Sequence, residues 1–136
     1  MRFMIIVKGN EDTEAARMPP QEVFDAMAAY HEELARAGVL LDGNGLQPTS
    51  KGWRIRYTGN KRTVIDGPFT EAKELVAGYT VIQVKSREEA LEWAKRFPKP
   101  LVKDCEIEVR QLFELEDFAQ FDGVERLREV GVSHER

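Results

Sequence analysis

The sequence contains a single cysteine, Cys105, among 136 residues. One thiol cannot form an intrachain disulfide and is too few for a thiolate zinc site. This shortage of cysteine is typical of proteins in a reducing compartment, so we expect a cytoplasmic protein. Because Cys105 opens an expected strand on its apolar side, we expect a buried, inert thiol there and not a nucleophile.

Long hydrophobic runs are also missing. No segment approaches the roughly 18 apolar residues needed to span a bilayer. The opening residues MRFMIIVKGN contain an apolar run too short for a signal-peptide core and lack a cleavage site. We therefore expect no membrane association, and 136 residues with 42% hydrophobic and 32% charged content suit one soluble domain.

Motifs for nucleotides, nucleic acids and metals are absent as well. The net charge of −4, with both signs interspersed, argues against direct nucleic-acid binding. The glycine-containing GNGLQP is neither a P-loop nor a dinucleotide fingerprint. The two histidines, His31 and His134, show no metal-ligand spacing, so we expect no metal site and no cofactor.

Two segments have the periodicity of amphipathic helices. In the first, apolar residues recur at spacings of four, three and four before Gly38 ends the helix; they are Val23, Met27, Tyr30 and Leu34. The second begins with a Ser-x-x-Glu capping box at Ser86 and stops at Pro98. Its expected buried face consists of Ala90, Trp93, Ala94 and Phe97.

Strand patterns surround these helices. We expect strands over 3–7, 79–84 and 105–113, and a hairpin in which WRIRYTG leads through Gly59-Asn60 into RTVID. Residues 39–41 predict a short strand that ends at the turn-formers of Asp42 to Gly45. Residues 70–76 predict about two helical turns ended by Gly78.

The order of these elements approximates a βαββαβ unit with an inserted hairpin, which predicts an α+β, ferredoxin-like subunit with an antiparallel sheet. We expect this domain over 1–113, followed by a charged extension over 114–136 that is helical or partly ordered. The helices of such a unit cover one sheet face. The other face must meet water or a second subunit, so we expect a homodimer.

Several separated motifs, in this order, resemble the YCII-related family and specifically its DGPF-containing branch: AYHEELARAGVLLDGNGLQP, KRTVIDGPFTEAKELVAGYTVIQV, SREEALEWAKRFP and IEVR. Asp66, Gly67, Pro68 and Phe69 match the branch motif residue for residue. The resemblance implies a dimeric α/β barrel of ferredoxin-like subunits. Most members are uncharacterised; one type of relative resembles a cofactor-free dehydrochlorinase, and some members are associated with extracytoplasmic sigma factors.

Asp66 and His31 are the candidate catalytic residues. Asp66 is a candidate general acid or base, because burial in a subunit cleft raises a carboxyl pKa toward neutrality, although an Asp before Gly-Pro also fixes turns by accepting backbone hydrogen bonds. His31 lies at the border of the apolar stripe of the first helix. A histidine there is a candidate proton shuttle or a packing residue, whereas we expect no role for His134.

Arg54 and Arg56 are the candidate substrate-binding residues. Both fall on the polar side of an expected strand, where guanidinium groups that face a cavity can hold a substrate carboxylate. The alternative is cross-strand ion pairing on a solvated face.

Two functions therefore stay open. The first is a cofactor-independent enzyme that moves protons on a small polar or anionic metabolite in a subunit cleft. The second is a non-catalytic dimeric binding or regulatory module, linked through the resemblance to sigma-factor-dependent transcription. Whether the protein is an enzyme at all is left undecided by the sequence.

Overall fold

The structure is a computed structural model that describes residues 1–133. Its strands are β1 (Arg2–Lys8), β2 (Leu40–Gly45), β3 (Trp53–Thr58), β4 (Lys61–Asp66), β5 (Val76–Gln83) and β6 (Ile107–Gln111). Its α-helices are α1 (Glu11–Glu14), α2 (Gln21–Arg36), α3 (Arg87–Lys95) and α4 (Val124–Glu129). His134 lies outside the described residues.

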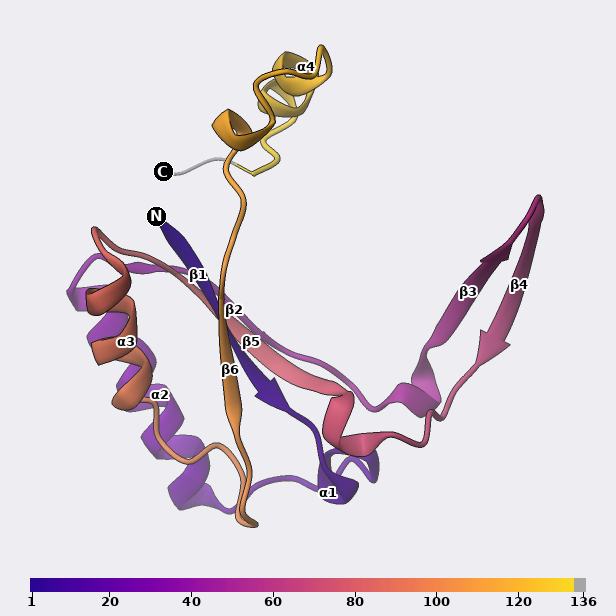
Figure 1. Ribbon diagram of the computed structural model, residues 1–136. Helices are drawn as coiled ribbons and strands as arrows, with labels where there is room; N and C mark the ends of the chain where they lie inside the picture. Colours follow the sequence, from indigo (N-terminus) through magenta and orange to yellow (C-terminus); the bar gives the residue numbers. More distant parts are fainter. Residues whose placement is uncertain (134–136) are drawn as a thin grey trace.

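Four strands form an antiparallel sheet in the order β2-β5-β1-β6. Helices α2 and α3, which follow β1 and β5, pack on the same side of this sheet (Figure 1). With the hairpin β3–β4 set aside, the chain reads strand, helix, strand, strand, helix, strand. The predicted α+β class and antiparallel sheet are confirmed, and the arrangement is consistent with a ferredoxin-like fold.

The core lies between the sheet and the two helices. It is built from the helix-facing side of β1 and β5 together with the apolar stripes of α2 and α3: Phe3, Ile5, Tyr30, Leu34, Val39, Ile82, Val84 and Ala90. Trp93 and Phe97 pack against this cluster, so the predicted buried face of the second helix is confirmed. Helix α2 ends where Gly38 adopts φ +74°, a left-handed conformation that favours glycine.

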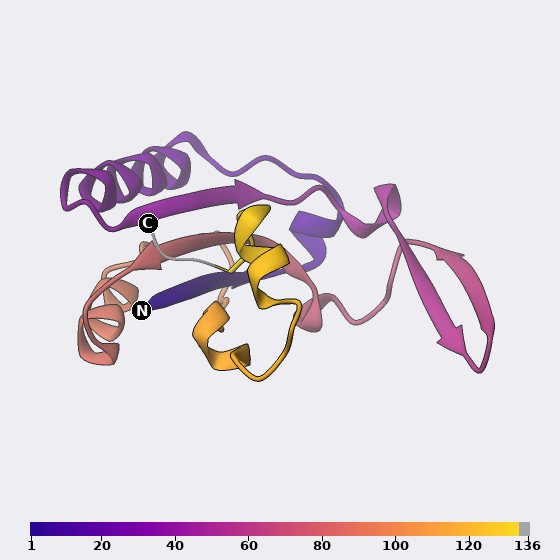
Figure 2. The same cartoon turned by 90° about the horizontal axis from the view of Figure 1, so that it is seen from above.

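Hairpin β3–β4 is a separate two-stranded sheet whose strands pair only with each other among the described elements. It projects away from the four-stranded sheet and its helices (Figures 1 and 2). The predicted inserted hairpin is therefore confirmed, and its strands turn at Gly59, which has φ +58°.

The sequence-based expectation was wrong at two segments beside β5. Residues 42–45 do not form a turn; they continue β2 and pair with β5 as far as Gly45. Residues 70–76 do not form two helical turns, because only Ala72–Glu74 is helical, as a 3-10 turn, and β5 already begins at Val76. Gly78 does not end a helix but lies inside β5, paired with Val7 and Gly45.

The chain after β6 forms a short 3-10 turn, Leu115–Phe118, followed by α4. Leu115 is buried, and Arg2 at the start of β1 binds Glu114 through a salt bridge with a 2.9 Å contact. The predicted final strand is shorter than expected, because β6 covers Ile107–Gln111 only. Among residues 1–133, no helix is both long and apolar enough to cross a membrane.

Candidate functional site

Glycines create a hollow between the sheet and α2. Cross-strand partners in an antiparallel pair share one face of the sheet, and the register pairs Gly43 with Thr80 and Gly45 with Gly78. On the face of β2 and β5 that is directed toward α2, these four neighbouring positions therefore carry three glycines and one threonine and no large side chain. A Cβ atom at Gly45 would meet no atom within 4 Å, so this position opens directly into free space.

The resulting pocket has a volume of about 520 Å³ and a largely apolar wall. Met18, Met27, Phe97 and Leu101 contribute apolar side chains to it. Its lining includes no aspartate, glutamate, lysine or arginine. The pocket is therefore suited to a small molecule of low charge, oriented by a few polar groups.

His31 contributes its imidazole to the lining of this pocket. It lies on α2, one turn after Met27, and its ring is close to the bare strand, since a Cβ atom at Gly43 would lie 3.6 Å from Nε2. The rings of Tyr30 and Phe97 meet the imidazole edge-on, at centroid distances of 5.7 and 6.3 Å. Packing therefore holds the imidazole in one orientation.

Two hydrogen bonds define the tautomer of His31. Nδ1 lies 2.8 Å from the main-chain oxygen of Met27, and Nε2 lies 2.8 Å from Oγ1 of Thr80. A carbonyl oxygen only accepts, so Nδ1 carries the proton of the neutral ring. Nε2 then accepts the hydroxyl hydrogen of Thr80, which leaves a basic nitrogen paired with a hydroxyl at the pocket wall.

Thr80 is the functional candidate that the sequence analysis missed. It lies 49 residues from His31 and is 3% exposed, in the middle of β5. The packing of α2 against β5 brings it beside His31. The signal that was present is the spacing of Gly43 and Gly45, which places two residues without side chains on one face of a strand.

The other predicted site residues do not join His31. Asp66 ends β4 with an exposed side chain, opposite Trp53, and Arg54 and Arg56 are exposed on β3. The His31 pocket is lined by none of these three residues. The guanidinium of Arg54 lies 3.7 Å above the ring of Phe69, a cation–π contact within the base of the hairpin.

The DGPF segment anchors that base. The amide of Gly67 donates to the carbonyl of Gly52 at 3.0 Å, and the amide of Phe69 donates to Oγ1 of Thr49, also at 3.0 Å. A Cβ atom at Gly67 would lie 1.8 Å from the carbonyl oxygen of Thr49, so only glycine fits. Gly67 and Phe69 thus have a structural explanation, whereas Asp66 ends β4 with an exposed side chain.

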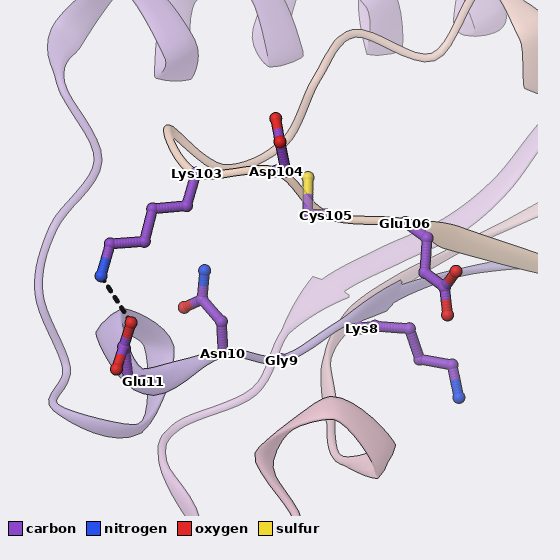
Figure 3. A pocket seen from close by; sticks show the side chains of 8 residues that line it. All are labelled: Lys8, Gly9, Asn10, Glu11, Lys103, Asp104, Cys105 and Glu106. Atoms are coloured by element: carbon purple, nitrogen blue, oxygen red, sulfur yellow. Dashed lines mark hydrogen bonds and ion pairs between the residues drawn. The ribbon is translucent and has the colours of Figure 1, made fainter.

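A second pocket, of about 410 Å³, lies where the loop before β6 faces the start of α1 (Figure 3). Charged side chains dominate it, and two of its lysines form ion pairs: Lys103 bonds Glu11 at 2.6 Å and Lys8 bonds Glu108 at 3.1 Å. Cys105 lines this pocket half-buried and lies outside β6, so the expectation of a buried thiol that opens the strand was wrong.

Across residues 1–133, no three His, Cys, Asp or Glu side chains are grouped so that they could hold a metal ion. Independently of this, Nε2 of His31 and the hydroxyl of Thr80 form a hydrogen-bonded pair that can exchange a proton with a molecule in the pocket.

The chain is similar in sequence and in fold to known proteins. An uncharacterised protein of Rhizobium meliloti (strain 1021) is 27% identical over 114 residues, which cover 82% of this chain and 92% of that protein. A solved structure of 5-chloro-2-hydroxyhydroquinone dehydrochlorinase from Burkholderia phenoliruptrix AC1100, in complex with 2,5-dihydroxybenzoquinone, is 16% identical. It covers 84% of this chain and 95% of its own, with a TM-score of 0.41. The family model of the YCII-related domain matches residues 1–116, and the chain belongs to that family.

Proposed function

We propose that the protein is a cofactor-independent enzyme that moves a proton on a small, uncharged molecule bound in the His31 pocket. The observation that carries this proposal is the pair formed by Nε2 of His31 and the hydroxyl of Thr80, 2.8 Å apart at the wall of a pocket without charged lining. A base that is oriented by a third group and bonded to a hydroxyl is the arrangement used for proton transfer in many active sites.

In the proposed step, one proton moves from the substrate to Thr80 and one moves from Thr80 to His31. The hydroxyl of Thr80 accepts a proton from a weakly acidic O–H or C–H group of the substrate while it passes its own proton to Nε2. The imidazolium that results keeps its Nδ1–H bond to the carbonyl of Met27. Return of the proton to another atom of the substrate completes an isomerisation or prepares the loss of a leaving group.

The substrate class follows from the lining. An anion would gain no ion pair inside the pocket, because its walls carry no lysine or arginine. We therefore propose a carbonyl compound with an acidic neighbouring C–H group in place of the broader class of polar or anionic metabolites. Arg54, Arg56 and Asp66 have no part in the step proposed for this protomer.

Three further proposals concern the family branch, the cellular compartment and the oligomeric state of the protein. We place the chain in the DGPF branch on the basis of Asp66 to Phe69, and in the cytoplasm on the basis of its single cysteine. We also propose that ferredoxin-like subunits pair as a dimeric α/β barrel. Its support is the sheet face opposite the helices, where Met4 and Ile6 are only half-buried.

Proton transfer is measurable before the natural substrate is known. A panel of small carbonyl compounds is first screened by thermal shift, and the binders are then incubated with the protein in D2O. Loss of C–H signals in the proton NMR spectrum reports enzyme-catalysed exchange. We expect His31→Gln to slow this exchange about 100-fold or more, Thr80→Val to slow it strongly, and Thr80→Ser to retain it because it keeps the hydroxyl.

Gly45 provides the control for binding. Gly45→Leu places a side chain into the open pocket, and we expect it to abolish the thermal shift, whereas Gly45→Ala leaves most of the volume free. Binders that depend on Gly45 but whose C–H groups never exchange would contradict the enzyme and favour the alternative, a non-catalytic binding or regulatory module.

A further inference from the structure

Another pocket adjoins the His31 pocket. It has a volume of about 440 Å³. Five residues line both pockets, and they are Thr13, Met18, Gly45, Leu46 and Ala77. The two pockets therefore lie side by side along the same residues, so one bound molecule can extend from the first into the second.

The adjoining pocket, which we call the Lys51 groove, differs from the His31 pocket in charge. Arg17 and Lys51 line it, and its lining includes no aspartate or glutamate. The chain as a whole has a net charge of −4, so two lining cations without a lining carboxylate are not a consequence of the overall composition. A site with this balance of charge favours an anionic group.

The two cations of the groove differ in how far their charge is already balanced. Nη1 of Arg17 forms an ion pair with Oδ1 of Asp12 at 2.5 Å. Lys51 is exposed, and no acidic side chain within residues 1–133 forms an ion pair with it. One unbalanced positive charge matches a single carboxylate, whereas the second charge of a phosphate group would find no partner.

Helix α1 determines where the walls of the groove lie. Glu14, the last residue of α1, accepts two hydrogen bonds from Thr49, one from the main-chain amide at 3.2 Å and one from the hydroxyl. Thr49 begins the 3-10 turn that ends at Lys51. After α1, the left-handed backbone of Ala16, with φ +57°, redirects the chain at Arg17. The backbone that carries both cations is thus positioned before a ligand binds, which lowers the cost of binding.

We propose that the substrate of the His31 pocket carries a carboxylate that binds in the Lys51 groove, so that the substrate is an oxo acid. This inference rests on the proposed function and narrows its substrate class. The carbonyl group and the acidic C–H group beside it occupy the His31 pocket, and this reacting part is uncharged, as the lining of that pocket requires. The carboxylate stays outside that pocket and pairs with the ammonium of Lys51.

Oxo acids of increasing length and their methyl esters are the probes: 4-oxopentanoate, 5-oxohexanoate and 6-oxoheptanoate. Each acid shares with its ester the carbonyl group and the neighbouring C–H groups, and differs from it in charge. Isothermal titration calorimetry at low ionic strength measures the dissociation constants. We expect at least one acid to bind about fivefold more tightly than its ester, which is the upper range for one exposed ion pair.

Two exposed lysines provide matched variants. Lys51→Met removes the unbalanced cation of the groove, and Lys85→Met removes a cation that lines neither the groove nor the His31 pocket. Both variants keep a long side chain and change the net charge by the same amount. We expect Lys51→Met to raise the dissociation constant of the acid about fivefold and that of the ester less than twofold. We expect Lys85→Met to change either constant less than twofold.

Two further measurements locate the bound molecule. Gly45 lines both pockets, so we expect Gly45→Leu to remove the binding of the acid and of the ester. We expect higher salt concentration to raise the dissociation constant of the acid and to leave that of the ester unchanged, because salt screens an exposed ion pair.

Three results would overturn the proposal. The first is that no acid binds more tightly than its ester, or that no probe binds at all. The second is an equal loss of acid binding in Lys51→Met and Lys85→Met, which would indicate attraction by the overall charge. The third is acid binding that is lost in Lys51→Met but unchanged in Gly45→Leu, which would indicate an anion held by Lys51 alone.

The exchange of C–H groups in D2O separates this inference from the proposed function. Acids that bind through Lys51 and Gly45, but whose C–H groups exchange no faster than in His31→Gln, would support the carboxylate site and contradict proton transfer. Exchange of the esters that depends on His31, with no gain for the acids, would overturn the carboxylate site and support proton transfer.

Discussion

At the scale of single residues, Tyr30 shows how a buried polar group is accommodated between α2 and α3. Its side chain is 4% exposed, and its hydroxyl donates to the main-chain oxygen of Trp93 at 2.6 Å. Burial disfavours the phenolate and raises the pKa of Tyr30 to about 12, against the lowering effect of Arg96. The hydroxyl is therefore a neutral donor at any physiological pH.

This environment makes stability depend on alkaline pH. The unfolded chain ionises Tyr30 near pH 10 and the folded protein only near 12, so the stabilising contribution is complete below about pH 10 and is lost as the pH rises through that window. We expect Tyr30→Phe to lower the free energy of unfolding by about 1 kcal/mol at neutral pH and to flatten its decline between pH 10 and 12.

Urea titrations at a series of pH values measure both effects. Tyr57→Phe on the exposed face of the hairpin is the control, and we expect it to keep the alkaline decline of the wild type. An identical decline in Tyr30→Phe would show that other groups determine alkaline stability.

At the scale of elements, the base of hairpin β3–β4 depends on Gly67. A Cβ atom there would lie 1.8 Å from the oxygen and 2.7 Å from the carbon of the Thr49 carbonyl, both main-chain atoms that cannot rotate away. We expect Gly67→Ala to lower the free energy of unfolding by about 3 kcal/mol and to reduce hydrogen-exchange protection along β3 and β4. Urea denaturation and hydrogen exchange measure these changes.

Gly45→Ala is the matched control, because a Cβ atom at Gly45 meets nothing within 4 Å. We expect it to be neutral or slightly stabilising. Equal midpoints for the two alanine variants would mean that the chain near Thr49 relaxes without loss of stability.

The extent of strand β2 could not be predicted from the sequence, in contrast to the helices and the hairpin. Apolar periodicity predicted α2 and α3 correctly, and alternation predicted the hairpin, because in those elements one face is packed and the other is not. In β2 the face toward α2 borders a pocket, so Gly43 and Gly45 stand where apolar residues would otherwise signal a strand. His31 was a candidate from the sequence, whereas Thr80 becomes one only through the packing of α2 on β5, because the two residues are 49 positions apart in sequence.

At the scale of the whole molecule, Arg2 and Glu114 tie the first strand to the segment after the last one. Nε of Arg2 donates to both carboxylate oxygens of Glu114 at 3.0 Å, and both side chains are largely buried. Bidentate pairs of this kind combine charge with fixed geometry. They attach residues beyond β6 to the sheet, beside the buried Leu115.

We expect Glu114→Gln to lower the free energy of unfolding by about 2 kcal/mol, because it leaves a buried guanidinium without its anion. Thermal and urea denaturation of the full chain check this value. The control is Asp104→Asn, which removes the exposed ion pair with Lys99, for which we expect less than about 0.5 kcal/mol. Similar losses in both variants would argue that the Arg2 pair contributes no more than a surface contact.

The two glycines of β2 that line the His31 pocket also determine how the size of the pocket can change in evolution. Glycine inside a strand is less favourable than alanine by roughly 0.5–1 kcal/mol, so Gly43 and Gly45 keep the pocket open against the conformational preference of β2. Small substitutions at these two positions would raise stability and shrink the pocket together. Under the proposed function, selection for a smaller substrate would meet no loss of stability at β2, whereas selection for a larger one would have to change other lining residues, such as Met18 and Met27.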